Sequence, residues 1–400
     1  MELVSTITAR TYPFERIEEF ADNGESLEVR IRGIERASVR PGKHLWERYR
    51  DFLPFESLDE ALSLGEGHTA LTGAGGRLRD HAGIDRLLLK NETQNPTWSF
   101  KDRGSLTCIA MARQMGEMVT ATISTGNMGH SMAAYGAKAG IRTLVFVPPY
   151  TTREKIMAMG IHGATVIKVS GPDYSVIKKS ILQMARSLSL RIVSGNGPIR
   201  VEGYKLTAFE LYEQMDGQVP DYIAVPTSAC GHTRGLFKGY KELHQAGLIR
   251  DLPKMIVVQA RNNRPIVGAI KQGKRHVIPF TDFQTVAGAI TTGNPMGGDE
   301  IIDKALRFGW LAEDVTEEEI LTSQKVLAES GYFVEPAAAT SLCAIRKLCK
   351  AGRIERDATV VMMLTGSGLK DMPVLRHHEP DVREVGIGEV EEVVSGLIHP

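Results

Sequence analysis

Blocks of apolar residues alternate with helix-like stretches along most of this chain. Short runs rich in β-branched residues are followed by Ala-rich or amphipathic stretches of about 10 to 16 residues. The predicted strands are residues 119–123, 143–147, 165–169, 191–194, 222–226, 255–259 and 359–364. The predicted helices are residues 127–139, 152–161, 174–188, 234–246, 316–330 and 337–351. Strands that alternate with helices of this length are typical of βαβ units and parallel sheets.

The N-terminal part of the chain and a stretch near residue 290 interrupt this alternation. Residues 1–60 are charged and irregular, with one helix-like stretch at 45–52, and residues 280–300 are rich in loop formers. Two sheets separated near residue 200 are the simplest account of the pattern. A chain of 400 residues with 42% hydrophobic content favours two domains over one.

Charge and cysteine content exclude several classes of protein. Lys+Arg and Asp+Glu balance at 48 each, so no overall field attracts nucleic acid or a membrane surface. No apolar run is long enough to span a bilayer, and residues 1–5 lack the start of a signal peptide. The four cysteines are scattered and form no CxxC pair, which is typical of reduced thiols. We expect a cytoplasmic protein without a metal site.

Residues 95–104, Asn-Pro-Thr-Trp-Ser-Phe-Lys-Asp-Arg-Gly, carry the strongest chemical signal. Lys101 follows a Pro-Thr turn and enters a predicted helix, so its amine is held in one direction. An unprotonated, oriented lysine amine can form an imine with pyridoxal phosphate. The alternative is an ordinary solvated surface lysine.

Three further loops each begin where a predicted strand ends. Residues 124–127 (Ser-Thr-Gly-Asn) precede a helix, where backbone N–H groups favour an anion such as a substrate carboxylate. Residues 226–233 (Pro-Thr-Ser-Ala-Cys-Gly-His-Thr) are small and also precede a helix, which suits a phosphate. Residues 364–371 (Leu-Thr-Gly-Ser-Gly-Leu-Lys-Asp) end the last strand. Each loop taken alone is equally compatible with a capped helix or a tight turn.

In this order the motifs resemble those of threonine synthases, from about residue 45 to residue 372. The resemblance extends to residues 63–69, 200–205, 293–295 and 335–337. It implies a tryptophan-synthase-β-like pyridoxal-phosphate enzyme of fold type II: an α/β protein whose two domains each hold a twisted, mostly parallel sheet flanked by helices. It also implies a lyase of amino-acid biosynthesis, and a homodimer.

The resemblance assigns roles to residues of this chain. Lys101 holds the cofactor aldehyde and then acts as general base at the substrate Cα. The Thr365 hydroxyl meets the pyridine nitrogen, where a neutral partner favours elimination and replacement over transamination. Asn127 contacts the 3′ oxygen of the cofactor, and residues Ser124, Thr125 and Gly126 hold the substrate carboxylate. The cofactor phosphate is assigned to the loop residues Ser228, Ala229, Cys230, Gly231 and His232.

The implied reaction converts O-phosphohomoserine and water to threonine and phosphate. A phosphorylated amino-acid substrate needs a second anion site, for which Arg200, Lys155 and Lys205 are the candidates and Arg153 a weaker one. Each of these cations has the alternative of a solvated surface charge.

The chain departs from the resembled pattern at three places. Trp98 stands where these enzymes carry Gly, Met128 stands where they carry Thr, and residues 194–196 change the segment before Arg200. A paralogue such as cysteate synthase, which joins O-phosphoserine and sulfite, is therefore the alternative. Another β-replacing or eliminating enzyme is a third, and a non-catalytic binding protein of the same fold is a fourth.

The resemblance also divides the chain. We expect an N-terminal extension at 1–45, a small α/β domain at 106–199 and a tail at 373–400. The large cofactor-binding domain would then comprise residues 46–105 and 200–372. Many threonine synthases carry a cysteine-rich zinc ribbon in the extension, but this chain has no cysteine before Cys108, so we expect no zinc there.

Overall fold

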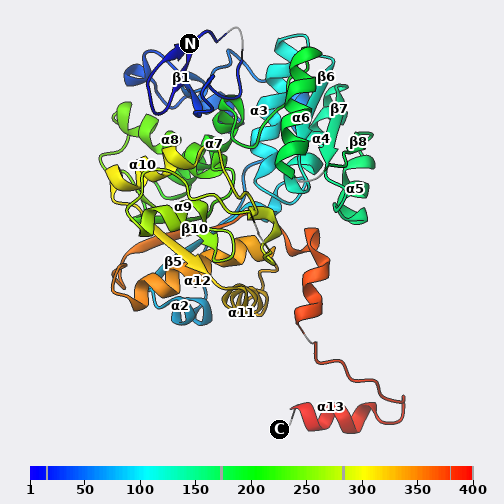
Figure 1. The fold of residues 1–400 in the computed structure, drawn as a ribbon. Helices are drawn as coiled ribbons and strands as arrows, with labels where there is room; N and C mark the ends of the chain where they lie inside the picture. Colours follow the sequence, from blue (N-terminus) through cyan, green and yellow to red (C-terminus); the bar gives the residue numbers. More distant parts are fainter. Residues whose placement is uncertain (15–16, 172–173, 282–283, 379, 399–400) are drawn as a thin grey trace.

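Three sheets organise the chain in the computed structural model (Figure 1), which describes residues 1–400 except 15–16, 172–173, 282–283, 379 and 399–400. The largest sheet has six strands in the order β11-β10-β9-β12-β5-β4 among the described residues. All neighbours are parallel except the edge strand β4, which runs antiparallel to β5. The strands are β4 (Leu71–Gly73), β5 (Arg86–Asn91), β9 (Tyr222–Pro226), β10 (Lys254–Ala260), β11 (Leu311–Val315) and β12 (Thr359–Leu364).

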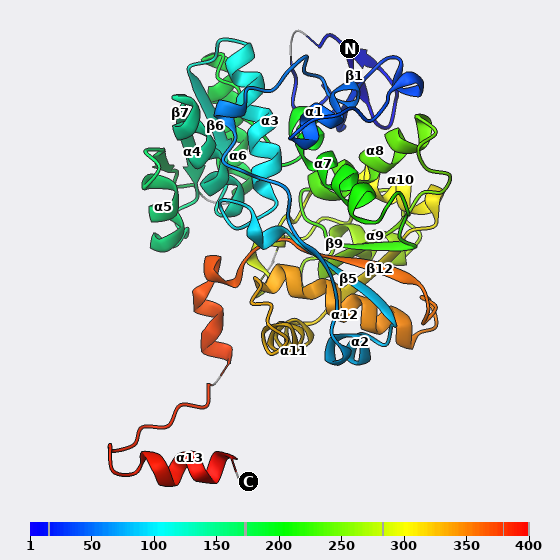
Figure 2. The same cartoon turned by 180° about the vertical axis from the view of Figure 1, so that it is seen from behind.

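The apolar strands of this sheet contribute side chains to two hydrophobic cores, one on each face. Ile223, Val225 and Met363 lie in one hydrophobic cluster, whereas Ala224 and Met362 lie in the other. Successive side chains of a strand point to opposite faces, so a strand that is covered on both sides is apolar throughout. The two faces are covered by different helices (Figures 1 and 2).

Helices from distant parts of the sequence form these two layers. On one face lie α7 (Pro198–Gln214), α8 (Gly231–Gln245), α9 (Pro265–Lys271) and α10 (Gly298–Phe308). On the other lie α2 (Gly76–Ala82), α11 (Glu317–Ala328) and α12 (Pro336–Lys350). Helix α7 is buried along nearly its whole length between α8 and α3 (Lys101–Gln114). Layers on both faces of a mostly parallel sheet define an α/β fold.

The second sheet is smaller and fully parallel. Its order is β6-β7-β8, with β6 (Val119–Ile123), β7 (Arg142–Val147) and β8 (Thr165–Lys168). Helices α4 (Asn127–Ala139), α5 (Arg153–Gly160) and α6 (Tyr174–Ser187) connect or follow these strands. Helix α3 packs against both α4 and α7, so it joins the small sheet to the large one.

The third sheet is antiparallel and lies in the N-terminal extension. It pairs β1 (Glu2–Ser5) with β2 (Thr11–Tyr12) and β3 (Leu27–Arg30). The helical stretch predicted at 45–52 is a single turn, α1 (Leu45–Arg48), followed by a 3₁₀ turn at Arg50–Phe52. The prediction of an irregular N-terminus was therefore wrong for the strands at residues 2–5, 11–12 and 27–30.

Most other predicted elements are confirmed within one to three residues. Strands 119–123, 222–226 and 359–364 and helix 127–139 have the predicted bounds. The predicted strand at 191–194 is wrong, because only Ile192 makes a bridge, to Ala121. The strands of the small sheet all lie before residue 200. The strands of the large sheet come partly before and partly after them in the sequence. The domain boundaries themselves stay a prediction.

The last residues extend away from the two layered sheets and end in α13 (Val390–Ile398) (Figure 1). Within the described part of the chain, no helix is both long and apolar enough to cross a membrane.

Candidate active site

The four sequence motifs meet at the carboxyl ends of parallel strands. Loop 124–127 follows β6, loop 227–230 follows β9, and Thr365 follows β12. The backbone N–H of Phe100 donates to the Thr365 carbonyl at 3.1 Å, which places the Lys101 turn beside the end of β12. Ligands of open α/β folds bind at this edge of the sheet.

Lys101 lies at the start of α3 with its amine over aromatic rings. Its Nζ is 4.2 Å from the centre of the Phe100 ring and 5.6 Å from that of Tyr204. Among the described residues, no carboxylate forms an ion pair with this amine. Burial, reinforced by the Arg200 guanidinium, lowers the pKa of Lys101 to about 7, whereas Glu335 acts in the opposite direction. A large fraction of the amine is therefore neutral and nucleophilic at physiological pH.

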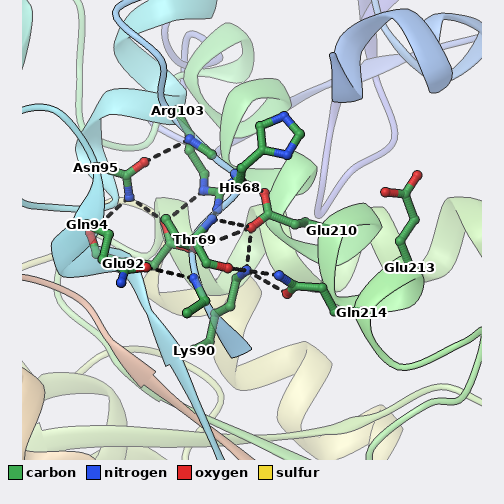
Figure 3. Close-up of polar contacts among 12 residues, drawn as sticks. His68, Thr69, Lys90, Glu92, Gln94, Asn95, Arg103, Glu210, Glu213 and Gln214 are labelled. Carbon is green, nitrogen blue, oxygen red and sulfur yellow. Dashed lines mark hydrogen bonds and ion pairs between the residues drawn. The ribbon is translucent and has the colours of Figure 1, made fainter. Parts of the chain in front are cut away.

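A buried ionic cluster fixes the first turn of α3 (Figure 3). Glu92 binds the Arg103 guanidinium at two points, both 2.7 Å, and Glu210 of α7 binds it at 2.8 Å. Lys90 pairs with Glu210 as well, and donates to the Thr69 carbonyl at 2.7 Å. Two cations balance two anions in a site without solvent, so each charge has a partner. Since Arg103 is two residues after Lys101, this cluster holds the lysine turn in place.

The 124–127 loop is organised mainly by its own hydrogen bonds. The Ser124 hydroxyl accepts from the N–H groups of Gly126 at 3.3 Å and Gly129 at 2.9 Å, so it caps α4. Thr125, Gly126 and Asn127 are half-buried. The Gly126 carbonyl also accepts from the His130 N–H at 3.2 Å, so both backbone groups of Gly126 are used within the loop.

Asn127 is oriented by a carboxylate that the motifs did not single out. Its Nδ2 donates to Oε2 of Glu335 at 2.8 Å. Glu335 precedes α12, and its N–H donates to the Gly366 carbonyl at 3.0 Å. Burial raises the pKa of Glu335. Asn127, Glu335 and the strand end at Thr365 thus form one hydrogen-bonded group beside Lys101.

The 226–233 loop forms the start of α8. The Ser228 hydroxyl lies 2.7 Å from that of Thr292, and Ala229 is half-buried. Cys230, the residue before α8, has a positive φ of 74° and a buried thiol whose pKa burial raises. A Cβ at Gly231 would lie 2.2 Å from the Gly195 carbonyl oxygen, so glycine is required for this close approach.

His232 contributes an unusual buried imidazole. Its ring stacks on Phe100 at 3.9 Å between centroids, and neither ring nitrogen has a hydrogen-bond partner among the described residues. Burial, with the charge of Lys101 adding to it, lowers the pKa of His232 to about 3. A neutral imidazole with two unsatisfied nitrogens next to Lys101 indicates a polar ligand there.

Arg200 is a buried cation with an unused donor. Its Nε donates to the Ser194 carbonyl at 3.0 Å and its Nη1 to the Ser105 hydroxyl at 3.3 Å. Its Nη2 and the Tyr204 hydroxyl are both buried and lie close together, and neither makes a hydrogen bond of good geometry among the described residues. An unpaired buried guanidinium N–H is costly unless a ligand completes it. Arg200 is therefore well suited to bind an anion near Lys101.

A chain of hydroxyls joins Arg200 to the carboxylate of Asp102. The Ser105 and Ser131 hydroxyls are 2.7 Å apart, and Ser131 donates to Asp102 at 2.6 Å. One hydroxyl has one proton, so Ser105 donates to Ser131 when Ser131 donates to Asp102. All bonds then run from the guanidinium toward the carboxylate. Burial raises the pKa of Asp102 to about 6, so it is mostly ionised at neutral pH.

The other three cations predicted to bind the substrate phosphate lie in different surroundings from Arg200. Lys205 is buried between Glu202 at 2.5 Å and Glu242 at 2.8 Å and also donates to the Phe52 carbonyl. Its ammonium is occupied by structural ion pairs, which makes Lys205 unsuitable as a substrate contact. Lys155 is half-buried on α5, where its charge acts on Asp371, and Arg153 is exposed.

Trp98 and His130 line one side of the lysine turn. Trp98 has a φ of 63°, a left-handed conformation that is unfavourable for a bulky residue and free for glycine. Its ring is 48% exposed and meets the edge of His130 at 6.4 Å between centroids. The Lys370 amine donates to the Thr97 carbonyl at 2.5 Å and contacts His130 Nδ1 at 2.9 Å. Burial, with Lys370 next in effect, lowers the pKa of His130 to about 3, so this imidazole is neutral.

Three of these site residues escaped the sequence analysis as individuals. Glu335 and Lys370 lie within the motifs at 335–337 and 364–371, which assign them no role of their own, and no motif includes His130. A glutamate directly before a proline that begins an apolar helix was the available signal for Glu335. The partners of all three come from distant parts of the chain, which no local pattern reports.

The sequence matches known proteins over most of its length. The family described as pyridoxal-phosphate dependent enzyme matches residues 62–366. A threonine synthase of Methanocaldococcus jannaschii is 38% identical over 326 residues, which cover 81% of this chain and 80% of that protein. A threonine synthase of Methanosarcina acetivorans is 37% identical, with 87% and 86% covered, and one of Halalkalibacterium halodurans is 35% identical, with 82% and 89% covered.

Solved structures share the fold at low sequence identity. The processed form of threonine deaminase isoform 2 from Solanum lycopersicum superposes with a TM-score of 0.65 at 17% identity, covering 77% of this chain and 86% of that one. A pyridoxal 5′-phosphate-dependent aspartate racemase superposes with a TM-score of 0.64 at 22% identity, covering 76% and 92%. The predicted α/β fold of type II is thereby confirmed.

Proposed function

This chain belongs to the pyridoxal-phosphate-dependent enzyme family, and we propose that within it the protein is a threonine synthase, a lyase of amino-acid biosynthesis. Its proposed reaction converts O-phosphohomoserine and water to threonine and phosphate. The proposal rests on the Lys101 amine, whose pKa is lowered to about 7, and on the buried Arg200 guanidinium next to it, whose Nη2 makes no well-formed hydrogen bond.

The residues present fit pyridoxal phosphate. Lys101 offers an amine with a lowered pKa, and the loop Ser228–His232 offers small residues and backbone donors at the start of the 15-residue helix α8. The unsatisfied nitrogens of His232 lie in the same place. Asn127 and the Thr365 hydroxyl are the proposed partners of the 3′ oxygen and the pyridine nitrogen. When bound, pyridoxal phosphate supplies an aldehyde and an electron sink for a carbanion at the substrate Cα.

The proposed role of Lys101 is to move the Cα proton. Its amine is held over Phe100 by the first turn of α3, and a pKa of about 7 lets it both accept and return a proton near neutral pH. The Thr365 hydroxyl is neutral, so it does not hold a pyridine nitrogen in the protonated state. That favours loss of a leaving group and addition of a nucleophile over transamination.

The proposed role of Arg200 is to bind the substrate phosphate. Two of its nitrogens are fixed by Ser194 and Ser105, which leaves Nη2 for the ligand. A guanidinium forms short charge-assisted bonds to phosphate oxygens. Lys155 is a second candidate, and Thr125 and Gly126 are proposed for the substrate carboxylate together with the cap formed by Ser124.

The test is product formation by the purified holoenzyme. Incubation with O-phosphohomoserine is expected to release phosphate and threonine in equal amounts, and Lys101→Ala is expected to abolish both. O-phosphoserine with sulfite is assayed in parallel, because Trp98 and Met128 change the neighbourhood of the lysine. Turnover of this second pair alone would replace the proposal by a cysteate-synthase reaction, and silence on both would overturn it.

Three further properties belong to the proposal on the strength of the family. We propose that the enzyme is cytoplasmic and a homodimer, and that residues 46–105 with 200–372 form the cofactor-binding domain beside a small domain at 106–199. Light scattering of the purified holoenzyme tests the dimer, and limited proteolysis tests the domain boundaries.

A further inference from the structure

The loop of residues 194–197 lies between Arg200 and the start of α8. The Ser194 carbonyl accepts from Arg200 Nε at 3.0 Å. The Gly195 carbonyl lies against Gly231 at the start of α8, and a Cβ at Gly195 would be 3.4 Å from Met128 Sδ and 3.6 Å from Ala229 Cβ. This loop therefore contacts Arg200 and the 226–233 loop and lies next to Met128 at the start of α4.

The N-terminal extension holds this loop from the outside. Glu19 accepts the Ser194 N–H at 2.9 Å, and its carboxylate lies 3.8 Å from Arg191. A Cβ at Gly197 would be 1.9 Å from Glu19 Oε2, so this glycine makes room for the carboxylate. Ser26 accepts from Asn196 Nδ2 at 3.1 Å in a buried contact. The extension thus contacts three of the four loop residues, Ser194, Asn196 and Gly197.

A third connection runs through Arg234 of α8. Its Nη1 donates to both the backbone and side-chain oxygens of Asn196 at 2.7 Å, and its Nη2 donates to the Leu27 carbonyl of β3 at 2.8 Å. Lys304 of α10 binds Glu28 of the same strand at 3.0 Å. The N-terminal sheet is therefore fastened to the helix that carries the proposed phosphate loop.

We propose that the N-terminal extension is part of the active-site scaffold, and that Glu19 and Ser26 are positioning residues that hold the 194–197 loop so that Arg200 presents its free N–H to a substrate phosphate. Neither residue touches the proposed ligand. The inference rests on the proposed function to the extent that Arg200 is the phosphate contact.

The test compares Glu19→Gln and Ser26→Ala with Asp22→Asn as a control in the same segment. Asp22 is exposed and pairs with Arg10 at 3.8 Å. The probe is inorganic phosphate, whose affinity for each holoenzyme is measured by calorimetry. Both test variants are expected to weaken phosphate binding about tenfold, whereas Asp22→Asn leaves it unchanged. With O-phosphohomoserine, KM is expected to rise by a similar factor while kcat changes less.

The two variants separate positioning from simple electrostatics. Loss of the Glu19 charge by itself strengthens the attraction of Arg200 for an anion, so tighter or unchanged binding in Glu19→Gln overturns the inference. Ser26→Ala changes no charge, so its effect measures only the loss of the hydrogen bond from Asn196. Thermal unfolding of each variant shows whether it is folded. If an Arg200→Lys variant bound phosphate like the wild type, Arg200 would not be the phosphate contact. Failure of the wild type itself to bind phosphate would count against the proposed function.

Discussion

The carboxylate of Glu335 lies in the space that a side chain on Gly366 would fill. A Cβ at Gly366 would be 2.6 Å from Glu335 Oε1 and 3.0 Å from its Oε2. Real Cβ atoms do not approach oxygens so closely, so glycine at 366 is the condition for this contact. The same carboxylate binds Asn127 at 2.8 Å, which links the end of β12 to the start of α4.

Gly366→Ala is therefore expected to displace Glu335 and to release the Asn127 amide. A misplaced Asn127 loses its proposed contact to the cofactor, and we expect cofactor affinity to fall by about tenfold or more. Fluorescence titration of the apoprotein with pyridoxal phosphate measures the effect. Gly76→Ala is the control, because a Cβ at Gly76 meets no atom within 4 Å. Unchanged affinity in Gly366→Ala would show that the Glu335 contact is dispensable.

Glu210→Gln tests the ionic cluster that supports the lysine turn. The change leaves Arg103 and Lys90 buried with one anion fewer, and we expect it to lower the free energy of unfolding by about 3–5 kcal/mol. Glu213→Gln, three residues along α7, removes the charge that pairs with Arg48 at a partly exposed position and is expected to cost at most about 1 kcal/mol. Urea unfolding of both variants measures the difference. Equal losses in the free energy of unfolding would show that the buried cluster is no more important for stability than the Arg48 pair.

The same cluster gives a pH dependence with a definite sign. Burial alone would raise the pKa of Glu210, but the charges of Arg103 and Lys90 outweigh burial and lower it below 4.5. The stabilisation is then fully present above about pH 4.5 and decreases as the pH falls below it. The stability difference between the wild type and Glu210→Gln should shrink in that acidic range.

The pKa of Lys101 predicts how the apoprotein captures its cofactor. The neutral amine reacts, so the capture rate is expected to rise through about pH 7 and to level off above it. Arg200 lowers this pKa, and Arg200→Met should therefore move the midpoint to higher pH. Stopped-flow absorbance across the range measures it, with a small primary amine as the reference for the ionisation of pyridoxal phosphate itself. A flat profile would contradict the lowered pKa.

Trp98→Gly tests the left-handed turn beside the lysine. Removing a large side chain from a core normally costs about 3–5 kcal/mol, and we expect that of Trp310→Ala, since Trp310 is 5% exposed. Trp98 is half-exposed at a positive φ that glycine adopts freely, so Trp98→Gly is expected to change stability by less than about 1 kcal/mol. Denaturant unfolding compares them, and a loss as large as that of Trp310→Ala would show that the ring is a packing element.

The parallel strands were predictable because burial leaves a simple trace in the sequence. Residues 222–226 and 359–364 are covered on both faces and are almost entirely apolar. Helix α7 could not be predicted in this way, because its residues Glu202, Lys205 and Glu210 are buried in ionic clusters instead of facing solvent. Where buried positions are charged, the apolar period of a helix disappears.

The site was predictable only where a motif is local. Lys101 and the loops around it lie within short segments, whereas the bond between Asn127 and Glu335 joins residues 208 positions apart. Lys205 is the opposite case, because its motif resembles a ligand-binding segment while its amine is held in ion pairs with Glu202 and Glu242. Its spacing from Glu202 already allowed an ion pair within the helix, which is what the structure contains.

The central claim is that Lys101 carries the cofactor, and reduction of the holoenzyme with borohydride followed by peptide mass mapping tests it most directly. Reduction fixes the cofactor to the amine that holds it. We predict that the added mass is found on the peptide containing Lys101 and is absent from Lys101→Ala. Recovery of the label on another lysine, such as the half-buried Lys370, whose pKa burial lowers to about 8, would contradict the account.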